Sequence, residues 1–334
     1  MTSEPRRTAP LGTTGLQITR VGLGTWAIGG PWDFGWGPQS DADSVAAIHE
    51  AVAAGINWID TAAVYGMGHS EEVVGRAVRE LPEADRPYVF TKCGLVWREG
   101  ETSAARVGAP DSIRREVEDS LRRLGVEAID LYQIHWPPQD GATVQEAWGA
   151  VVDLIEAGKV RFGGVSNFTA EQLAACELIR HVDTLQPPLS ALERGVLGET
   201  LDWCADHDTG VIVYSPMQAG LLTGGWSHER FTALDAGDWR RKSDHFTGDL
   251  FDRNLAFAER LGAIARRLGC TSGELAIAWT LAQRGVTGAI CGARKPGQVA
   301  GWAGAGEVAL DDATLAELGD ALRDTGAGRG PIPG

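Results

Sequence analysis

Four side chains in this sequence have the types needed to move a proton: Asp60, Tyr65, Lys92 and His135. A phenol with a pKa of about 10 is a poor proton donor at neutral pH. A nearby ammonium group favours the phenolate, so we expect Lys92 to lower the pKa of Tyr65. A buried lysine requires a counter-charge, which Asp60 supplies. His135 can hydrogen-bond a reacting oxygen or share the proton with Tyr65, and since neither role requires a metal ion we expect no metal site.

Each of these residues lies at or just beyond the end of a predicted strand. In the segment NWIDTAAVYG (57–66) a short apolar strand stops at Asp60, and Tyr65 follows five residues later in a glycine-rich turn. Lys92 and His135 end two later predicted strands. Taken singly, each residue has an ordinary alternative role. Asp60 could be a turn former or helix cap, and Tyr65 a wall residue. Lys92 could be part of a structural ion pair, and His135 a packed core histidine. Four such coincidences are much rarer than one, so the combination favours a catalytic site.

Predicted strands and helices alternate along most of the chain, as in a parallel sheet with its helices outside. Helix starts are marked by a serine cap at Ser70, followed by Glu71 and Glu72, and by the capping box Thr169-x-x-Gln172. Eight core strands are predicted to end near Gly24, Asp60, Lys92, His135, Ser166, Pro187, Tyr214 and Cys291. We therefore predict an α/β fold, a single (β/α)₈ TIM barrel with an N-terminal β-hairpin and a long loop after strand 7. Strand ends of one polarity then share a rim, which brings the four residues together.

The alternative fold is a doubly wound open sheet, which would carry a Gly-x-Gly-x-x-Gly fingerprint after an early strand. Gly22-Leu23-Gly24 is followed by Thr-Trp-Ala and lacks the third glycine and a helix start, so we favour the barrel. We expect residues 1–10 to be a mobile N-terminal tail, residues 11–325 the barrel and residues 326–334 a Gly/Pro-rich C-terminal tail. Residues 216–252 lack periodicity and are either a lid over the site or an unstructured surface loop.

Composition restricts the classes of partner. The 334 residues include 30 Lys and Arg against 45 Asp and Glu, a formal net charge of −15, so we expect repulsion from nucleic acid and from anionic membranes. The sequence has no run of about 18 apolar residues and no signal-peptide core. Five scattered cysteines without a C-x-x-C pair indicate reduced thiols. We therefore expect a cytoplasmic protein whose partner is a small molecule, and its oligomeric state does not follow from the sequence.

Several segments together resemble the aldo-keto reductases. They are GLGTW (22–26), DTAAVYG (60–66), FTK (90–92), DLYQIHWP (130–137), GVSNF (164–168), YSPMQAGLLTG (214–224) and GARKPGQV (292–299). They occur in the family's order, and the similarity extends from about Leu11 to Arg323. The most similar branches are bacterial and related to the potassium-channel β-subunits and the inositol-operon reductases. The resemblance implies a catalytic Asp, Tyr, Lys and His tetrad, which maps without gaps onto Asp60, Tyr65, Lys92 and His135.

The resemblance also implies a cofactor, NADPH or NADH in its place, bound across the rim without a Rossmann domain. Ser166, Asn167 and Gln186 would hold the carboxamide, and Tyr214 would stack on the nicotinamide ring. The full implied set is Gly24, Thr25, Trp26, Asp60, Ser166, Asn167, Gln186, Tyr214, Ser215, Pro216, Met217, Gln218, Gly220, Leu221, Gly292, Arg294 and Gln298.

The residues expected at the adenosine end of the cofactor bear on the choice between NADPH and NADH. Arg294 and Lys295 are adjacent cations at a predicted helix start in an acidic chain, which indicates a phosphate site; the alternative is a solvated surface turn. Gly301 and Trp302 stand where many family members have a Glu and an Asn that contact the adenine. The sequence therefore leaves the choice between NADPH and NADH open.

Twelve tryptophans, several of them in loops after strands, indicate a substrate pocket with aromatic walls. The predicted pocket comprises Trp26, Trp32, Trp36, Tyr65, Trp97, His135 and Trp136. We expect an NAD(P)H-dependent oxidoreductase that reduces an aromatic or sugar-like aldehyde or ketone to the alcohol, with Tyr65 as proton donor. Two alternatives remain. One is the same site working as a sugar or alcohol dehydrogenase, and the other is a cofactor-binding regulatory subunit of the channel β-subunit type.

Overall fold

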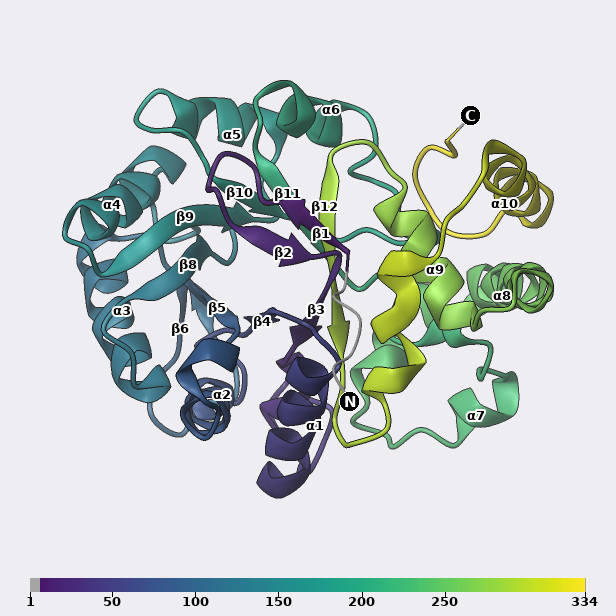
Figure 1. Ribbon diagram of the computed structural model, residues 1–334, viewed down its shortest axis with the longest axis horizontal. Helices are drawn as coiled ribbons and strands as arrows, with labels where there is room; N and C mark the ends of the chain where they lie inside the picture. The colour runs from purple at the N-terminus through teal and green to yellow at the C-terminus, as the bar shows by residue number, and fades with distance from the viewer. Residues whose placement is uncertain (1–6, 334) are drawn as a thin grey trace.

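The alternation of strands and helices produces a closed parallel barrel (Figure 1). The computed structural model describes residues 7–333. Within them the barrel strands, in their order around the barrel, are β3 (Val21–Gly24), β4 (Trp58–Asp60), β5 (Tyr88–Cys93), β8 (Ile129–Ile134), β9 (Val160–Ser166), β10 (Thr184–Gln186), β11 (Gly210–Tyr214) and β12 (Val286–Gly292). Strand β12 pairs in parallel with β3 and closes the barrel. The predicted TIM barrel is confirmed.

Strand register places the polar strand-end residues at one level of the rim. Asp60 lies opposite Phe90, which is two residues before Lys92, and Lys92 lies opposite Gln133, which is two residues before His135. Side chains two residues apart on a strand face the same side of the sheet. Asp60, Lys92 and Gln133 are all buried, and the register therefore gathers them inside the mouth of the barrel.

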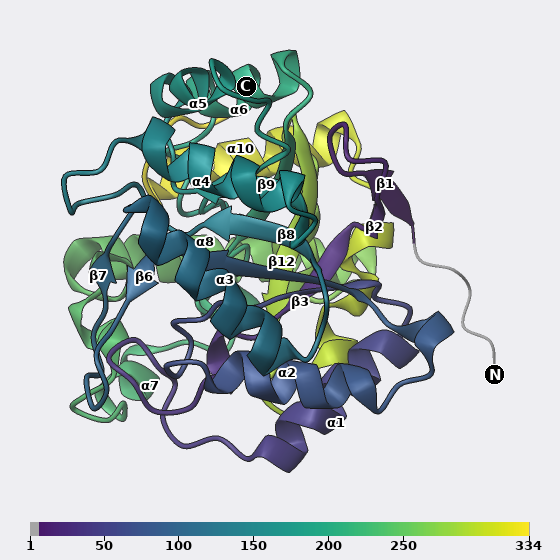
Figure 2. The same ribbon diagram turned by 90° about the vertical axis from the view of Figure 1, so that its left-hand side faces the viewer.

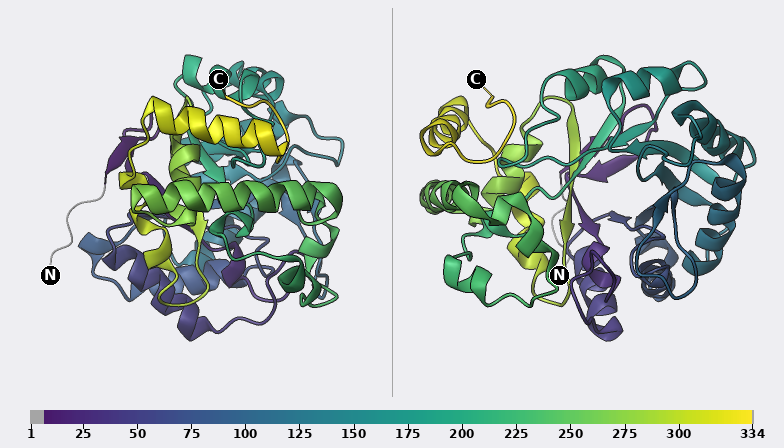
Figure 3. Two further views of the ribbon diagram at one scale, coloured as in Figure 1. Left: turned by 90° about the vertical axis from the view of Figure 1, so that its right-hand side faces the viewer. Right: turned by 180° about the vertical axis from the view of Figure 1, so that it is seen from behind.

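Helices cover the outside of the barrel (Figures 1 and 2). The α-helices of the described residues are α1 (Asp41–Ala53), α2 (His69–Arg79), α3 (Pro110–Leu124), α4 (Val144–Glu156), α5 (Ala170–Glu177), α6 (Glu199–Asp206), α7 (His228–Thr232), α8 (Gly248–Leu268), α9 (Ser272–Leu281) and α10 (Asp312–Thr325). The longest, α8, lies beside α10 (Figure 3). No helix in this part of the chain is long and apolar enough to cross a lipid bilayer.

An N-terminal hairpin covers the end of the barrel opposite the predicted site. It consists of β1 (Thr8–Pro10) and β2 (Gln17–Thr19), which pair antiparallel. Gly12 in its turn has φ +51, and a Cβ there would come within 2.6 Å of the backbone nitrogen of Gly210 at the start of β11. Hairpin and barrel residues share one buried cluster: Leu11, Leu16, Ile18, Trp58, Phe90, Leu131, Ile212 and Ile290. This cluster fills the interior, so ligands enter only from the other end.

Helix α2 begins differently from the sequence prediction. Its N-cap is Gly68, in the left-handed conformation, so the prediction of a cap at Ser70 is wrong. Ser70 is instead fully buried, and its Oγ lies 2.8 Å from the hydroxyl of Thr25 and 3.0 Å from the hydroxyl of Thr61. Ser70 can make these contacts because Gly68 occupies the cap position, where its φ is 101°, a value that glycine adopts without strain. Ser70 thereby attaches α2 to the ends of β3 and β4.

The long loop after β11 is present and contains short helical segments. These are η3 (Leu221–Thr223), α7, η4 (Trp239–Lys242) and η5 (Asp244–Phe246), and α8 begins at Gly248. The expectation of an irregular stretch as far as residue 252 is wrong in this respect, because single helical turns are too short to show a 3.6-residue apolar repeat. Trp239 of η4 lies 5.4 Å from Trp26 between ring centroids, so the loop reaches back to the segment after β3.

Both termini of the described chain contact the barrel. Pairing of Thr8–Pro10 in β1 places these residues in the hairpin and not in the tail expected over residues 1–10, whose first six residues lie outside the described part. After α10, the chain is held by Arg194, which donates hydrogen bonds to the carbonyls of Gly330 at 3.1 Å and Pro331 at 3.0 Å. Residues 326–333, the expected C-terminal tail, contain no helix or strand. The hydrogen bonds from Arg194 nevertheless hold them against the loop after β10.

Candidate active site

A buried ion pair lies at the centre of the rim. Lys92 Nζ lies 2.5 Å from Asp60 Oδ1 and also donates to the carbonyl of Thr61 at 2.8 Å. Both charged side chains are almost completely buried. A buried ammonium needs a counter-charge and hydrogen-bond acceptors, and Asp60 and Thr61 provide them. Lys92 also donates to the phenolic oxygen of Tyr65 over 3.4 Å.

Tyr65 and His135 face each other beside this ion pair. Their ring centroids are 5.8 Å apart with an interplanar angle of 77°. Tyr65 keeps part of its surface exposed, whereas His135 is buried. The structure thus brings together all four residues that the sequence predicted as catalytic, with the phenol placed between the ammonium of Lys92 and the imidazole.

Burial controls the protonation states of this group. Burial, followed by the charge of Asp60, raises the pKa of Tyr65 well above its usual value. Lys92 was expected to lower this pKa, but the net shift is upward, because desolvation disfavours the phenolate and the charge of Asp60 adds to this effect. Burial also lowers the pKa of Lys92, against the opposing effect of Asp60. Tyr65 therefore holds its proton.

The imidazole of His135 is neutral at physiological pH. Burial lowers its pKa well below the usual value, and the positive charges of Lys92 and Arg106 lower it further. A neutral imidazole keeps one N–H, which can donate a hydrogen bond, and one bare nitrogen. His135 can therefore donate to an oxygen placed next to Tyr65 without adding a charge to the site.

Two glutamine amides complete the environment of Asp60. Gln186 Nε2 donates to Asp60 Oδ2 at 2.8 Å and to Gln133 Oε1 at 3.2 Å, and Gln133 Nε2 donates to the same carboxylate oxygen at 3.4 Å. Both glutamines are buried. Gln186 was predicted as a cofactor ligand, whereas Gln133 was missed. The signal available was a polar residue two positions after Leu131 and two before His135, and therefore on the same face of the predicted strand.

The residues predicted to hold a carboxamide are also linked to each other. Asn167 has a positive φ of 64°, and its Nδ2 donates to the carbonyl of His135 at 3.0 Å. Tyr214 donates its hydroxyl proton to Asn167 Oδ1 at 2.8 Å, and Ser166 donates to the carbonyl of Gln186 at 2.7 Å. Asn167 therefore fixes the position of Tyr214 relative to His135. Strain at a non-glycine residue of this kind is frequent at functional sites.

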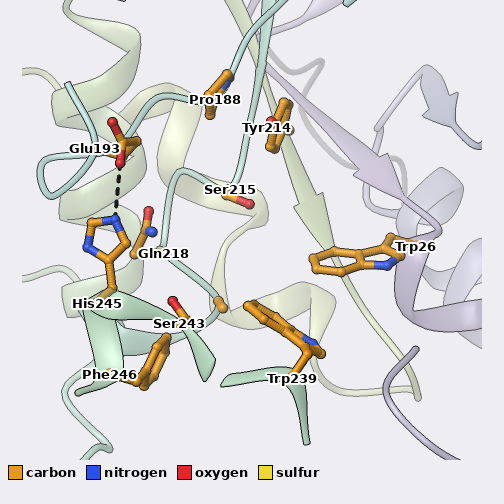
Figure 4. Close-up of a pocket in the computed structure, with 11 residues that line it drawn as sticks. Trp26, Pro188, Glu193, Tyr214, Ser215, Gln218, Trp239, Ser243, His245 and Phe246 are labelled. Atoms are coloured by element: carbon orange, nitrogen blue, oxygen red, sulfur yellow. Dashed lines mark hydrogen bonds and ion pairs between the residues drawn. The ribbon is translucent and has the colours of Figure 1, made fainter. Parts of the chain in front are cut away.

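A cavity of about 320 Å³ lies beside Tyr214 (Figure 4). Its lining comprises Trp26, Pro188, Glu193, Tyr214, Ser215, Gln218, Ala219, Trp239, Ser243, His245 and Phe246. Ser215, Gln218 and Ala219 all have positive φ. Backbone in such left-handed conformations can turn successive N–H groups towards an anion. The cavity thus joins a ring-stacking surface at Tyr214 to a backbone segment suited to phosphates, as a dinucleotide requires.

One wall of this cavity comes from residues 239–246, which we call the cover segment. Trp239, Trp26 and Trp36 pack with ring centroids 5.4, 5.7 and 6.0 Å apart. At the other end, His245 Nε2 lies 3.1 Å from the carboxylate of Glu193, as Figure 4 shows. This hydrogen bond lowers the pKa of Glu193. The sequence analysis missed Glu193, Ser243, His245 and Phe246, because contacts across a loop leave no periodic signal.

Other predicted cofactor residues serve partly structural roles. Thr25 is fully buried, and its N–H donates to the carbonyl of Asp60 at 2.9 Å. Pro216 and Leu221 are buried, so only their backbone groups could face a ligand. Gly24 ends β3, and Gly292, exposed to solvent, ends β12. Met217 and Gly220 lie within the same left-handed segment as Gln218.

Arg294 is already engaged by the protein. Its Nε donates to Gln39 Oε1 at 3.0 Å and its Nη2 to the carbonyl of Pro38 at 2.8 Å, while Nη1 makes no hydrogen bond to a described residue. Gln298 accepts from the backbone N–H groups of Arg294 and Lys295. The predicted helix start after them is a 3₁₀ turn, Val299–Gly301. Arg294 is therefore held in place with one face available for an anion.

The predicted substrate aromatics divide into three groups. Trp26 and Trp36 pack with the cover segment. Trp32 lies 6.2 Å from the Tyr65 ring, and Trp136 lies beside His135 and under the guanidinium of Arg106. Trp97 lines a separate hollow of about 440 Å³. Only the second group is placed next to the four catalytic candidates, and it combines an aromatic wall with a cation.

Comparison with known proteins agrees with this geometry. A profile described as "Aldo/keto reductase family" matches residues 20–323. The chain is 37% identical to "Aldo-keto reductase YhdN" of Bacillus subtilis (strain 168) over 287 residues, 86% of this chain and 84% of that protein. It is 34% identical to "NADH-specific methylglyoxal reductase" of Escherichia coli (strain K12) over 328 residues, 94% of this chain and 98% of that protein.

Solved structures give the same result. The glycerol dehydrogenase AKR11B4 from Gluconobacter oxydans superposes with a TM-score of 0.88 at 38% identity, and 98% of each chain is covered. The holo form of aldo-keto reductase AKR11C1 from Bacillus halodurans superposes with a TM-score of 0.78, covering 95% of this chain and 96% of that chain. At 24% identity this second likeness concerns the fold alone.

Proposed function

The chain belongs to the aldo/keto reductase family, and we propose from this membership that Asp60, Tyr65, Lys92 and His135 are its catalytic residues. The protein is an NAD(P)H-dependent oxidoreductase that acts on carbonyl and alcohol groups. The observation that carries the assignment of roles is the contact of Lys92 with both Asp60 at 2.5 Å and Tyr65 at 3.4 Å. A phenol next to a buried ammonium is suited to donate its proton during the reaction, because the ammonium stabilises the phenolate that forms. Before the reaction, burial keeps the phenol protonated.

When bound across this rim, a nicotinamide cofactor would supply the hydride for reduction of the carbonyl carbon. Tyr65 donates its proton to the carbonyl oxygen as negative charge develops there. Lys92 stabilises the phenolate that results, and Asp60 keeps Lys92 in place and charged. Neutral His135 donates a hydrogen bond to the same oxygen, which stabilises its developing charge. In the direction of alcohol oxidation the same groups act in reverse, and Tyr65 accepts the proton.

We propose that the cofactor lies across the rim, from Gln186 to Arg294. Both hydrogens of Gln186 Nε2 are used within the protein, so its Oε1 is the atom that would accept from the carboxamide. Tyr214 would stack on the nicotinamide ring, and residues 215–221 would hold the diphosphate. Five free cysteines fit a reducing compartment, and a cytoplasmic location is part of this proposal, as is the similarity to branches related to the channel β-subunits and inositol-operon reductases.

Replacement of Tyr65 by Phe tests the mechanism. Tyr65→Phe removes the proton donor and leaves the ring, so turnover of an aldehyde should fall by a factor of about 10² to 10⁴. Cofactor affinity, measured by fluorescence titration, should change little because the hydroxyl contacts Lys92 and not the cavity at Tyr214. Tyr88→Phe, a change at the opposite end of the barrel, is the control. Unchanged turnover in Tyr65→Phe would remove Tyr65 from this role.

The choice between the two cofactors depends on Arg294. If its free Nη1 contacts the ribose phosphate of NADPH, Arg294→Ala should raise the dissociation constant for NADPH by about tenfold and that for NADH by less than about threefold. Fluorescence titration of both cofactors with the variant measures this. Equal losses for NADPH and NADH would show that Arg294 only joins the loop at Pro38 and Gln39 to β12.

A further inference from the structure

Arg106 carries a guanidinium that has no polar partner in the described chain. Its side chain makes no hydrogen bond or ion pair with any residue from 7 to 333, and its Cζ lies 4.1 Å above the ring of Trp136. The side chain is half-buried. In a protein with a net charge of −15, an arginine with free N–H donors is available to an anion.

The backbone holds Arg106 between the loops of two catalytic strands. It belongs to β7 (Ala105–Arg106), which pairs with β6 (Leu95–Val96) in the loop that follows β5 and Lys92. Its carbonyl accepts from the N–H of Gln139 at 3.1 Å, in the loop that follows His135. The backbone of Arg106 is therefore held in the loop after β5 and hydrogen-bonded to the loop after β8.

The side chain of Arg106 packs on the loop that carries His135. Its guanidinium lies over the ring of Trp136, the residue after His135, whereas the neighbouring Ala105 and Val107 line the separate hollow next to Trp97, which Arg106 does not line. Its charge also reaches His135, whose pKa it lowers together with burial and Lys92. The cation thus lies near the imidazole that would bind the carbonyl oxygen.

Nearby carboxylates do not neutralise this cation. Asp140, on the loop after β8, accepts from the backbone N–H groups of Gly108 and Ala109, both at 3.1 Å. Glu116, behind the loop after β5, accepts from the N–H of Gly94 at 2.8 Å. Both acids accept hydrogen bonds from the backbone around Arg106, and among the described residues no carboxylate forms an ion pair with its guanidinium.

We propose that Arg106 binds an anionic oxygen group, a carboxylate or a phosphate, on the substrate and so selects anionic aldehydes and ketones. This inference rests on the proposed function, since it places the carbonyl between Tyr65 and His135. An arginine presents a planar set of N–H donors that matches such groups. Stacking on Trp136 holds that plane in place before binding, which reduces the entropy lost when the anion is bound.

The test compares aldehydes that differ only in charge. We would measure kcat/KM with NADPH or NADH for 4-formylbenzoate against 4-formylbenzamide, for 4-oxobutanoate against 4-oxobutanamide, and for glyceraldehyde 3-phosphate against glyceraldehyde. In at least one pair the wild type should favour the anion by about tenfold or more. The first two pairs identify a carboxylate and the third a phosphate.

Three variants separate binding of the anion from a structural role. Arg106→Gln should bring the ratio in the favoured pair close to one, while kcat/KM for the neutral compound stays within about threefold. Arg106→Lys should keep part of the preference, because it retains the charge without the planar donor set. Arg98→Gln, an exposed arginine on the same loop, should leave the ratio unchanged. Melting temperatures of all variants check their folding.

Two results would overturn the inference without affecting the proposed function. One is a wild type that reduces the neutral aldehydes but prefers no anion in any pair. The other is an Arg106→Gln variant that loses activity equally on both members of the favoured pair. If the wild type reduced none of the six compounds with either cofactor, the proposed function would fail and this inference with it.

Discussion

At the scale of single residues, the site is organised by how burial and charge act on each titratable group. Asp60 receives hydrogen bonds from Lys92, Gln186 and Gln133, so a carboxylate is stable there despite complete burial. The same burial keeps Tyr65 protonated and His135 neutral. The site therefore contains one matched pair of charges and two neutral hydrogen-bond donors, a combination suited to receiving a polar but uncharged carbonyl group.

The neutral state of His135 predicts the pH dependence of the reaction. An imidazole of ordinary pKa, about 6.5, would change charge between pH 8 and pH 5.5, whereas His135 should stay neutral over this range. We expect kcat for reduction to change by less than about twofold there. An acid limb centred near pH 6.5 that disappears in His135→Gln would contradict this expectation.

The same shift affects stability, and its sign follows from linkage. Because the folded-state pKa of His135 is depressed, the unfolded chain binds this proton more readily once the pH falls below about 6.5. Folding stability attributable to His135 is therefore lost on acidification and recovered above that pH. His135→Gln should show a smaller decrease in melting temperature between pH 7.5 and pH 5.5 than the wild type. An equal decrease in both proteins would show that other groups control the acid sensitivity.

At the scale of elements, the rim is held together by polar contacts between helices and strands. Glu71 of α2 is fully buried and accepts from Thr91 of β5 and from Arg123 of α3, both at 2.6 Å. Glu71 lies in the first turn of α2, as the sequence predicted, and its side chain in addition joins α2 to β5 and α3. Thr91 precedes Lys92, so this contact restrains the strand that carries the catalytic ammonium.

The cover segment forms one wall of the cavity at Tyr214. Trp239 packs on Trp26, and Arg240 places its guanidinium 4.7 Å from the ring of Trp36 and 5.1 Å from that of Trp226. The contacts with Trp26 and Trp36 join the loops after β11 and β3 through side chains, without strand pairing, whereas Phe246 at the other end of the segment is buried in the core. We propose that the end at Trp239 can move without disturbing the barrel, as a lid formed by part of residues 216–252 would.

Removal of the Trp239 ring tests this interpretation. Trp239→Ala deletes the contact between the cover segment and Trp26, so the cofactor should dissociate at least about tenfold faster in stopped-flow fluorescence, as expected when a lid limits release. The melting temperature should change little because the ring lies outside the barrel core. Trp203→Ala on α6, where the ring stacks on His207, is the control at a distance. An unchanged dissociation rate would indicate that the segment is a fixed wall and not a lid.

At the scale of the whole molecule, the barrel has one closed end and one functional end. The β1–β2 hairpin packs Leu11, Leu16 and Ile18 against the barrel interior, and this side is closed to ligands. The opposite rim carries the ends of the eight parallel barrel strands; Figure 2 shows β8 and β9 running away from the hairpin end. Residues far apart in sequence, from Asp60 to Arg294, therefore lie on one rim, along which we propose that the cofactor binds.

The sequence by itself determined the barrel and the four residues at its centre. A period of two within strands and of 3.6 within helices is a local property, and parallel strands in a barrel all end at one rim. Asp60, Lys92 and His135 could therefore be grouped from their positions at strand ends. Tyr65 followed because its turn is marked by glycines and lies directly after a strand.

Only the tertiary structure decided the pKa values of these groups and which residues surround them. The pKa of Tyr65 is raised by burial and by the charge of Asp60, so the net shift is opposite to the lowering predicted from Lys92. The amide of Gln133, the cover segment with His245 and the unpaired Arg106 depend on contacts between distant loops, which leave no repeat in the sequence. The physical reason is that periodicity reports which face of an element is buried, whereas charge state and access depend on what lies opposite that face.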